Sequence, residues 1–143
     1  NIEAKKNFQE LLNRFPESEY AKDSRQKLIF INENIAAKDM EVAIFYLNQK
    51  QYLAALGRYN KVIEKYPKSK FIPEALYRLV EIYTILGMEE EAEKAASVIV
   101  YNYPKSVWYE ESYNLINEEY YKKNKVTLRK KIFNLFKKNE PTE

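Results

Sequence analysis

The sequence predicts an all-α fold of tetratricopeptide-like antiparallel helix hairpins, with about eight helices forming a right-handed solenoid. Three observations predict it: a helix-favouring composition, a joint motif that recurs three times, and small and aromatic residues at fixed offsets from each recurrence. Only two of the 143 residues are Gly and five are Pro, whereas 45% are hydrophobic. Such a composition is typical of long helices rather than of strands joined by tight turns.

The joint motif consists of an aromatic residue, Pro, any residue, Ser, any residue and a second aromatic residue. Its prolines are Pro16, Pro67 and Pro104, which lie 51 and 37 residues apart. Because Pro cannot continue the preceding helix and Ser can cap the next one, each motif is read as a joint between helices, with its aromatic residues packed across the joint. Pro73 follows Ser69 closely, so we expect that helix to start two or three residues late.

The residues before two of these prolines match the tetratricopeptide pattern. Ala55 and Tyr59 precede Pro67, and Ala92 and Ala96 precede Pro104 at the same offsets. Small residues there let the two helices of a hairpin approach closely. We therefore expect Ala55 and Ala92 at helix crossings, after a half repeat that opens the chain.

The turn inside each hairpin is expected to differ between the two full repeats. Gly87 falls where the first helix of its hairpin must end in a left-handed conformation, which Gly adopts without steric cost. The equivalent residue of the preceding repeat is Lys50. We therefore expect that turn to be built differently.

The longer proline spacing leaves room for one additional long helix. Leu28, Ile31 and Ile35 recur on one face of it, and we expect a break near Lys38 and Asp39 before the next hairpin. The predicted domains are a helical repeat domain over 1–121, incomplete at its N-terminus, and a basic amphipathic C-terminal helix with its tail over 122–143. The expected helices cover residues 3–15, 18–37, 39–50, 52–66, 71–87, 89–103, 107–122 and 126–138.

No catalytic, cofactor or metal site is predicted. The chain has neither Cys nor His, which excludes cysteine nucleophiles and removes the commonest metal ligand and general base. Acidic residues follow one another along helix faces instead of converging from different elements, and no glycine-rich phosphate loop exists. Core filling also explains the tyrosines at core and joint positions better than base stacking does: Tyr20, Tyr46, Tyr52, Tyr59, Tyr66, Tyr83, Tyr101 and Tyr103.

Positive charge gathers at the C-terminal end. Eight of the 24 basic residues but only two of the 21 acidic ones lie in 122–143, around an apolar stripe of helical spacing. One interpretation is a helix that caps the exposed face of the last hairpin. The other is a helix that lies on an anionic membrane surface or in a partner's groove, through Lys122, Lys123, Arg129, Lys130 and Lys131.

A closer resemblance rests on several segments in order. They are the first joint, Phe15-Pro16-Glu17-Ser18-Glu19-Tyr20-Ala21, then residues 27–31, Glu41-Val42-Ala43 with Tyr46, Tyr52 with Ala55 and Arg58, and Lys65-Tyr66-Pro67. In order and spacing they resemble the C-terminal part of the BamD family, the tetratricopeptide lipoproteins of the outer-membrane β-barrel assembly machinery. The long helix between joints is also a family feature. The resemblance covers about residues 4–116 and leaves the tail without a counterpart.

The resemblance implies a non-enzymatic adaptor on the periplasmic side of the outer membrane, tethered through a lipidated N-terminus that precedes this segment. Its implied partners are the periplasmic domain of BamA, accessory lipoproteins of the same machinery and unfolded outer-membrane proteins, with no nucleic acid expected. The family's BamA-contacting arginine matches Arg58, nine residues before Pro67. Another periplasmic repeat adaptor, similar to the cell-division coordinator CpoB, and a membrane-surface or nucleic-acid binder acting through the basic tail are the alternatives.

Arg58 is expected at the edge of the core stripe, because it follows Ala55 by three residues and precedes Tyr59 by one. From that position the guanidinium can reach outward to a partner's carboxylate. Replacing Arg58 should then weaken binding and leave the melting temperature nearly unchanged.

Overall fold

A computed structural model of the chain describes residues 2–115 and 134. Across these residues the chain forms α-helices and no strand, which confirms the all-helical class. The helices are α1 (Ile2–Arg14), α2 (Glu19–Asn48), α3 (Tyr52–Lys65), α4 (Ile72–Ile85), α5 (Glu89–Asn102) and α6 (Val107–Leu115).

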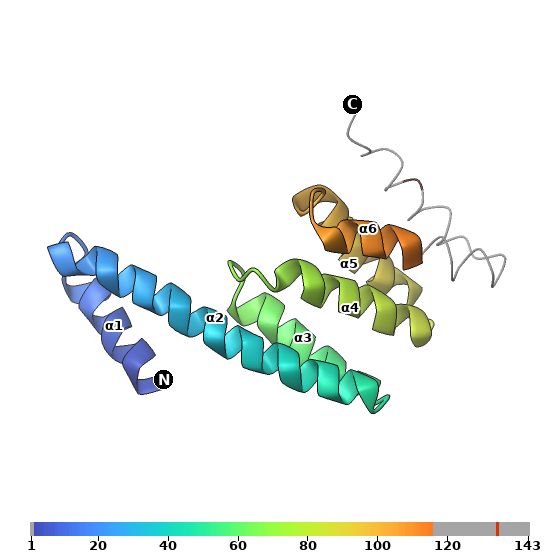
Figure 1. Cartoon of the computed structure of the whole chain (residues 1–143), viewed down its shortest axis with the longest axis horizontal. Coiled ribbons are helices and arrows are strands. Elements are labelled where there is room, and N and C mark those ends of the chain that lie inside the picture. Colours follow the sequence, from blue (N-terminus) through green and yellow to red (C-terminus); the bar gives the residue numbers. More distant parts are fainter. Residues whose placement is uncertain (1, 116–133, 135–143) are drawn as a thin grey trace.

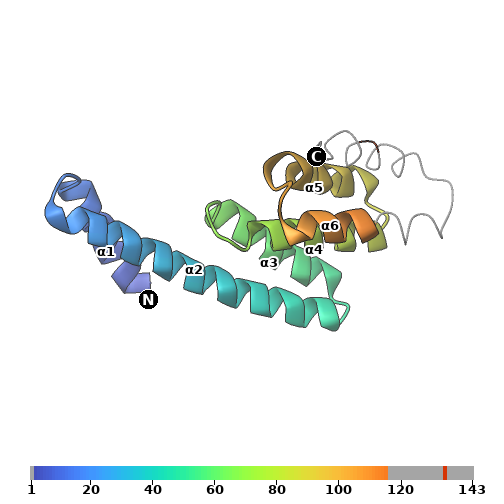
Figure 2. The same cartoon turned by 45° about the horizontal axis from the view of Figure 1, so that its top comes forward.

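The helices pack as successive antiparallel neighbours, with α2 as the longest (Figure 1). α1 lies along the N-terminal half of α2, and α3 lies along its C-terminal half. α4 packs on α3, and both α5 and α6 pack on α4. Figure 2 shows the same order from a second direction, with α1 well separated from α5 and α6. The layered hairpins are those expected of a tetratricopeptide-like fold.

The predicted break near Lys38 and Asp39 is wrong. α2 runs through both residues without interruption over its 30 residues, so the helices expected over 18–37 and 39–50 are a single helix. The segment contains no Gly or Pro that would end a helix. Ala36, Met40 and Ala43 are buried at helical spacing, so one stripe packs continuously across the expected break.

The joint serines behave differently from one another. Ser106 caps α6 as predicted, because its Oγ accepts the backbone N–H of Tyr109 at 3.2 Å. Ser18 precedes α2 but makes no side-chain cap bond; its hydroxyl donates instead to the carbonyl of Phe15 at 3.0 Å. The predicted capping role is therefore wrong for Ser18.

Ser69 ties the loop before α4 to α2. Its hydroxyl donates to one carboxylate oxygen of Glu33 at 3.0 Å, and the backbone N–H of Lys70 donates to the other at 3.1 Å. α4 itself begins at Ile72, with Pro73 in its first turn. This late start confirms the expected displacement and places Ser69 in a tertiary contact.

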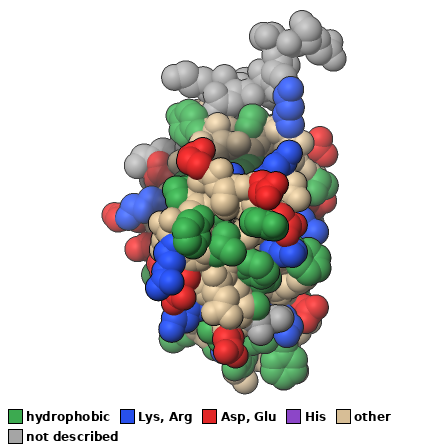
Figure 3. Space-filling view, turned by 90° about the vertical axis from the view of Figure 1, so that its left-hand side faces the viewer, with side chains coloured by type: hydrophobic (Ala, Val, Ile, Leu, Met, Phe, Trp, Pro, Cys, Tyr) green, Lys and Arg blue, Asp and Glu red, His purple; other side chains and the backbone are tan. Residues whose placement is uncertain are grey.

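The joint aromatics pack at the second and third joints but not at the first. Tyr66 is buried at the second joint, and the rings of Tyr77 and Trp108 lie 5.2 Å apart at the third. At the first joint Phe15 is 61% exposed and Tyr20 is 68% exposed, which corrects the predicted packing there. In the space-filling view from the α1–α2 end, hydrophobic side chains gather on the surface (Figure 3).

The two hairpin turns have the same construction, contrary to the prediction. Lys50 has a positive φ of 57° and Gly87 has one of 71°. The N–H of Lys50 donates to the carbonyl of Leu47 at 2.9 Å, and the N–H of Gly87 donates to that of Thr84 at 3.1 Å. In each turn the next N–H reaches the carbonyl five residues earlier, which completes a Schellman motif. Lys50 therefore adopts a backbone conformation that favours Gly.

The core runs from the C-terminal half of α2 to α5. Ala55, Tyr59 and Ala92 are each 0% exposed, which confirms their predicted core positions. α1 contains no buried residue. Tyr101 was predicted as a core or joint residue but is 63% exposed. That prediction is therefore wrong for Tyr101, as it is for Tyr20.

The C-terminal predictions fall mostly beyond the described residues. α6 corresponds to the start of the helix expected over 107–122. The helix expected over 126–138 and the tail 122–143 lie outside the described part, apart from Asn134. Within residues 2–115, no helix combines the length and apolar character required to cross a membrane.

Candidate partner-binding site

The site around Arg58 is built on a buried carboxylate of α2. Asp39 lies on the stripe that faces α3, close in sequence to the buried Ala36, Met40 and Ala43. Its side chain is only 7% exposed. A carboxylate removed from water to this extent requires positively charged or hydrogen-bonding partners.

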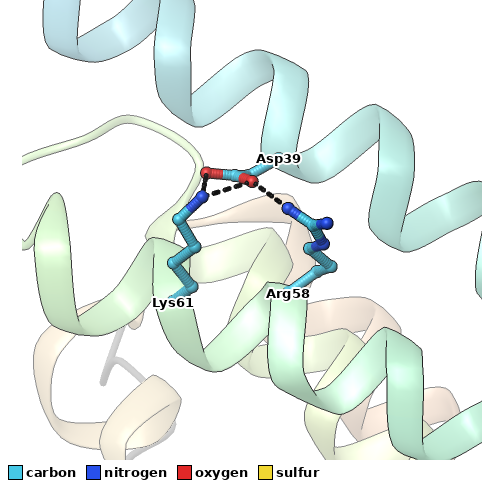
Figure 4. Close-up of polar contacts among 3 residues, drawn as sticks. All are labelled: Asp39, Arg58 and Lys61. Carbon is cyan, nitrogen blue, oxygen red and sulfur yellow. Dashed lines mark hydrogen bonds and ion pairs between the residues drawn. The ribbon is translucent and has the colours of Figure 1, made fainter. Parts of the chain in front are cut away.

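Two cations of α3 supply those partners (Figure 4). Arg58 Nη1 donates to Asp39 Oδ1 at 3.0 Å. Lys61 Nζ lies 2.9 Å from the same oxygen and 2.7 Å from Oδ2. Arg58 and Lys61 are three residues apart on one helix, so both side chains can converge on one point of the facing helix.

The resulting cluster of Asp39, Arg58 and Lys61 has one net positive charge. The Arg58 side chain remains 41% exposed and that of Lys61 35% exposed, while the carboxylate is covered. The bond to Asp39 uses only one nitrogen of the guanidinium. A guanidinium has five N–H donors in a planar fork, so it can bind a second carboxylate while Asp39 holds it in place.

The next hairpin shows that the fold itself does not require this cluster. With the repeat offset of 37 residues, Asp39 corresponds to Leu76 and Arg58 corresponds to Ala95. Both equivalents are buried apolar residues, 5% and 6% exposed. The same helix crossing is thus built once with an ion pair and once with hydrocarbon.

Arg78 of α4 has a different, structural environment. Its guanidinium lies over the rings of Tyr77 and Trp108, 5.2 and 5.6 Å from their centroids, and donates to Glu81 at 3.0 Å. Burial disfavours the charged guanidinium, but the hydrogen bond and charge of Glu81 outweigh it and raise the pKa of Arg78 above its ordinary value. This arginine joins α4 to α6.

Arg58 was expected from the sequence, whereas Asp39 and Lys61 were not. A signal for Asp39 was present: it is an acidic residue on an otherwise apolar helical stripe, between Ala36 and Ala43. Such a residue needs a buried partner of opposite charge. The predicted break near Lys38 concealed the signal, because it placed Asp39 at a helix start.

Chemically, the cluster can bind an anion but has no catalytic arrangement. Within the described residues, no three or more acidic, His or Cys side chains gather so as to hold a metal ion. The tail residues proposed for a membrane or partner surface lie outside the described residues: Lys122, Lys123, Arg129, Lys130 and Lys131.

The comparison with known proteins agrees with the helical fold described above. The sequence profile of the YfiO family, described as outer membrane lipoproteins, matches residues 1–99. Proteins named outer membrane protein assembly factor BamD are similar to this chain. The one from Rickettsia prowazekii is 42% identical over 113 residues and that from Caulobacter vibrioides 40% identical over 111. The one from Xylella fastidiosa is 35% identical over 106 residues.

These alignments cover most of the chain but only part of the relatives. They include 79%, 78% and 74% of this chain, and 45%, 36% and 36% of the Rickettsia, Caulobacter and Xylella proteins. The chain thus spans less than half the length of the relatives it matches. The family profile covers both α1–α2 and the hairpin that carries Arg58. By profile, similarity and hairpin architecture, the chain belongs to the YfiO/BamD family of outer membrane lipoproteins.

Proposed function

We propose that this chain is part of a non-enzymatic scaffold for the assembly of outer-membrane proteins, and that Arg58 binds a folded partner. The observation that carries the proposal is the cluster of Asp39, Arg58 and Lys61, which presents an anchored and half-exposed guanidinium with one net positive charge. Relatives named assembly factors support the biological setting.

The proposed partner is the periplasmic domain of BamA closest to the barrel. Accessory lipoproteins of the machinery and unfolded outer-membrane proteins are proposed as further partners of the whole protein. We place the protein on the periplasmic side of the outer membrane, tethered through a lipidated N-terminus, with hairpins that continue as a right-handed solenoid. Family membership favours this proposal over a CpoB-like adaptor.

Arg58 suits this role physically because its conformation is restricted before the partner arrives. The bond to Asp39 limits the rotamers of a long side chain, so less conformational entropy is lost on binding. The planar fork can donate two parallel hydrogen bonds to the oxygens of a partner carboxylate, which a lysine cannot do. Because Asp39 neutralises one of two cations, the cluster favours a single additional negative charge.

Calorimetric titration of the chain with the BamA domain tests the proposal. Arg58→Glu should weaken binding by roughly 2 kcal/mol or more, because it places a second carboxylate beside Asp39 and repels the partner's. Arg58→Lys should lose less, since it keeps the charge without the fork. Lys94→Glu, at an exposed position of α5, is the control for net charge. An affinity for Arg58→Glu equal to that of the parent rejects the site.

The basic tail supports a second, separate proposal. Residues 122–143 hold eight basic and two acidic residues, so they suit an anionic membrane surface. Binding to anionic vesicles and to DNA, measured with and without this segment, tests it. Equal vesicle binding by both chains rejects a membrane role, and DNA binding lost on truncation favours nucleic acid instead.

The non-enzymatic part of the proposal has its own test. A stoichiometric transition metal in the purified chain contradicts it.

A further inference from the structure

Gly57 occupies a position where this fold has no need of glycine. It lies in the interior of α3, where Gly costs helix stability relative to Ala. Its φ is not positive, so the backbone does not require it. A Cβ built on Gly57 meets no atom within 4 Å, so no described neighbour requires its small size. Neither helix propensity nor packing against the described residues therefore accounts for glycine at this exposed position.

The residues around Gly57 form one outward face of α3, which consists of Leu53, Ala54, Gly57, Arg58 and Lys61. At 100° per residue these five positions cover an arc of about 140°, opposite the buried side of the helix. Leu53 is 78% exposed, a large apolar side chain without a described covering neighbour. The arc therefore joins an apolar residue, a bare backbone and the two cations.

The equivalent face of the next hairpin is charged at the positions of Leu53 and Gly57, whereas its Ala95 is buried and its Val98 is an exposed apolar residue. The repeat offset of 37 residues aligns Leu53 with Glu90 and Gly57 with Lys94, both exposed. The two faces occupy the same place in their hairpins, so general requirements of the fold act on both. A leucine at position 53 and a glycine at position 57 are thus not required by the hairpin itself.

We propose that the outward face of α3 is a docking surface on which a folded partner packs its main chain against Gly57. The proposal rests on the proposed function of Arg58 and extends that site along the helix. The occupant is an acidic segment of the partner, because the face offers Arg58 and Lys61 with one net positive charge beside Leu53. Gly57 permits the approach, Leu53 is covered, and the partner's carboxylate lies on Arg58.

A small residue beside an anchored arginine would make the proposed contact selective. Without a Cβ at Gly57, a partner backbone can come closer to α3 than any other residue would permit. That approach places the partner's acidic side chain within reach of a guanidinium whose position Asp39 already fixes. A partner that offers negative charge but a bulky surface would reach Arg58 without covering Leu53.

Substitution at Gly57 separates docking from folding, because the two effects have opposite signs. Gly57→Ala should raise the melting temperature by about 3 °C, since the Cβ is accommodated and helix propensity improves. It should also weaken binding of the BamA domain about fivefold, and Gly57→Leu should weaken it more than 30-fold. Leu53→Ala should weaken binding about tenfold. Lys94→Leu adds the same side chain at the equivalent position of α5 and should leave binding unchanged.

The outcomes distinguish this inference from the function on which it rests. If Arg58→Glu loses binding while Gly57→Leu binds as the parent does, the docking surface is wrong and the Arg58 site stands. If the parent chain does not bind the BamA domain, both are wrong. Sedimentation of the chain alone tests a second copy as the occupant: a dimer that Gly57→Leu dissociates overturns the proposed partner. Weaker binding by a Gly57→Leu chain that remains folded and monomeric supports the proposal.

Discussion

Replacement of Arg58 by Ala tests how much the guanidinium contributes to folding. From the sequence alone, Arg58→Ala is expected to leave stability nearly unchanged, but the buried ion pair changes that expectation. The substitution leaves a carboxylate of 7% exposure with Lys61 as its one cation among the described residues. A hydrogen bond to a charged group contributes roughly 1.5–3 kcal/mol. The 41% exposure of Arg58 and the remaining Lys61 contact at 2.7 Å reduce this value. We expect a loss of about 1–2 kcal/mol in the free energy of unfolding.

The second hairpin supplies the compensating change. Its equivalents of Asp39 and Arg58 are Leu76 and Ala95, so the double variant Asp39→Leu/Arg58→Ala introduces the apolar pair that the chain already uses at this crossing. Lys61, whose equivalent is Val98, loses its carboxylate, but its side chain is 35% exposed and can reach water. Replacing a buried ion pair by hydrocarbon of similar volume is often neutral or stabilising. The double variant should therefore unfold within about 1 kcal/mol of the parent, or be more stable.

Urea and thermal unfolding of the parent, both single variants and the double variant measure this coupling. For a domain of this size, a loss of 1 kcal/mol lowers the melting temperature by about 3–5 °C. Arg58→Ala should melt clearly below the parent, and the added Asp39→Leu should restore it. A double variant less stable than Arg58→Ala alone, or an Arg58→Ala chain that melts with the parent, refutes the burial argument.

Three further predictions concern the folded chain. Ala55→Leu and Ala92→Leu each insert bulk at a position of 0% exposure and should cost about 1–3 kcal/mol in urea unfolding; if both melt within about a degree of the parent, these are not tight crossings. Lys50→Gly should stabilise by about 1 kcal/mol, because Lys50 has a φ of 57°; an unchanged urea midpoint contradicts this. Burial raises the pKa of Tyr59 to about 12 from 10.0, and its hydroxyl has no hydrogen-bond partner in the described structure. The stabilising effect of neutral Tyr59 is therefore complete below pH 10 and lost as the pH rises through 12. Tyr59→Phe should be neutral or stabilising at pH 7. Between pH 10 and 12 the free energy of unfolding of the variant should fall by ~3 kcal/mol less than that of the parent, because phenylalanine does not ionise; parallel pH profiles of the two free energies would refute it.

The sequence specified most of the fold because the relevant signals are local. Pro104 and Ser106 mark a joint through backbone chemistry that acts within a few residues, and Ser106 caps α6 as expected. Ala55 and Ala92 lie at helix crossings for a steric reason that spacing alone expresses. Lys50 was misread, because the turn conformation is set by its hydrogen bonds and tolerates a residue other than Gly.

The site was predictable only in part because its geometry depends on contacts distant in sequence. Arg58 was found through a family resemblance, whereas its partner Asp39 lies 19 residues earlier on another helix. The tie between Glu33 and Ser69 spans 36 residues. Serine in a joint motif indicates a cap, and no local pattern shows that this hydroxyl bonds a distant carboxylate.

The predicted break near Lys38 and the missed ion pair have one physical origin. At the start of a helix, the carboxylate of Asp39 would bind nearby backbone N–H groups and would need no cation from α3. Because α2 continues, those N–H groups are used within the helix, and Asp39 must find its partners across the hairpin. The same continuity fixes Arg58 against a helix that is also held by α1 and by the loop before α4. A partner that binds α3 therefore meets a surface positioned by rigid helices, which hold a binding group more closely than a loop does.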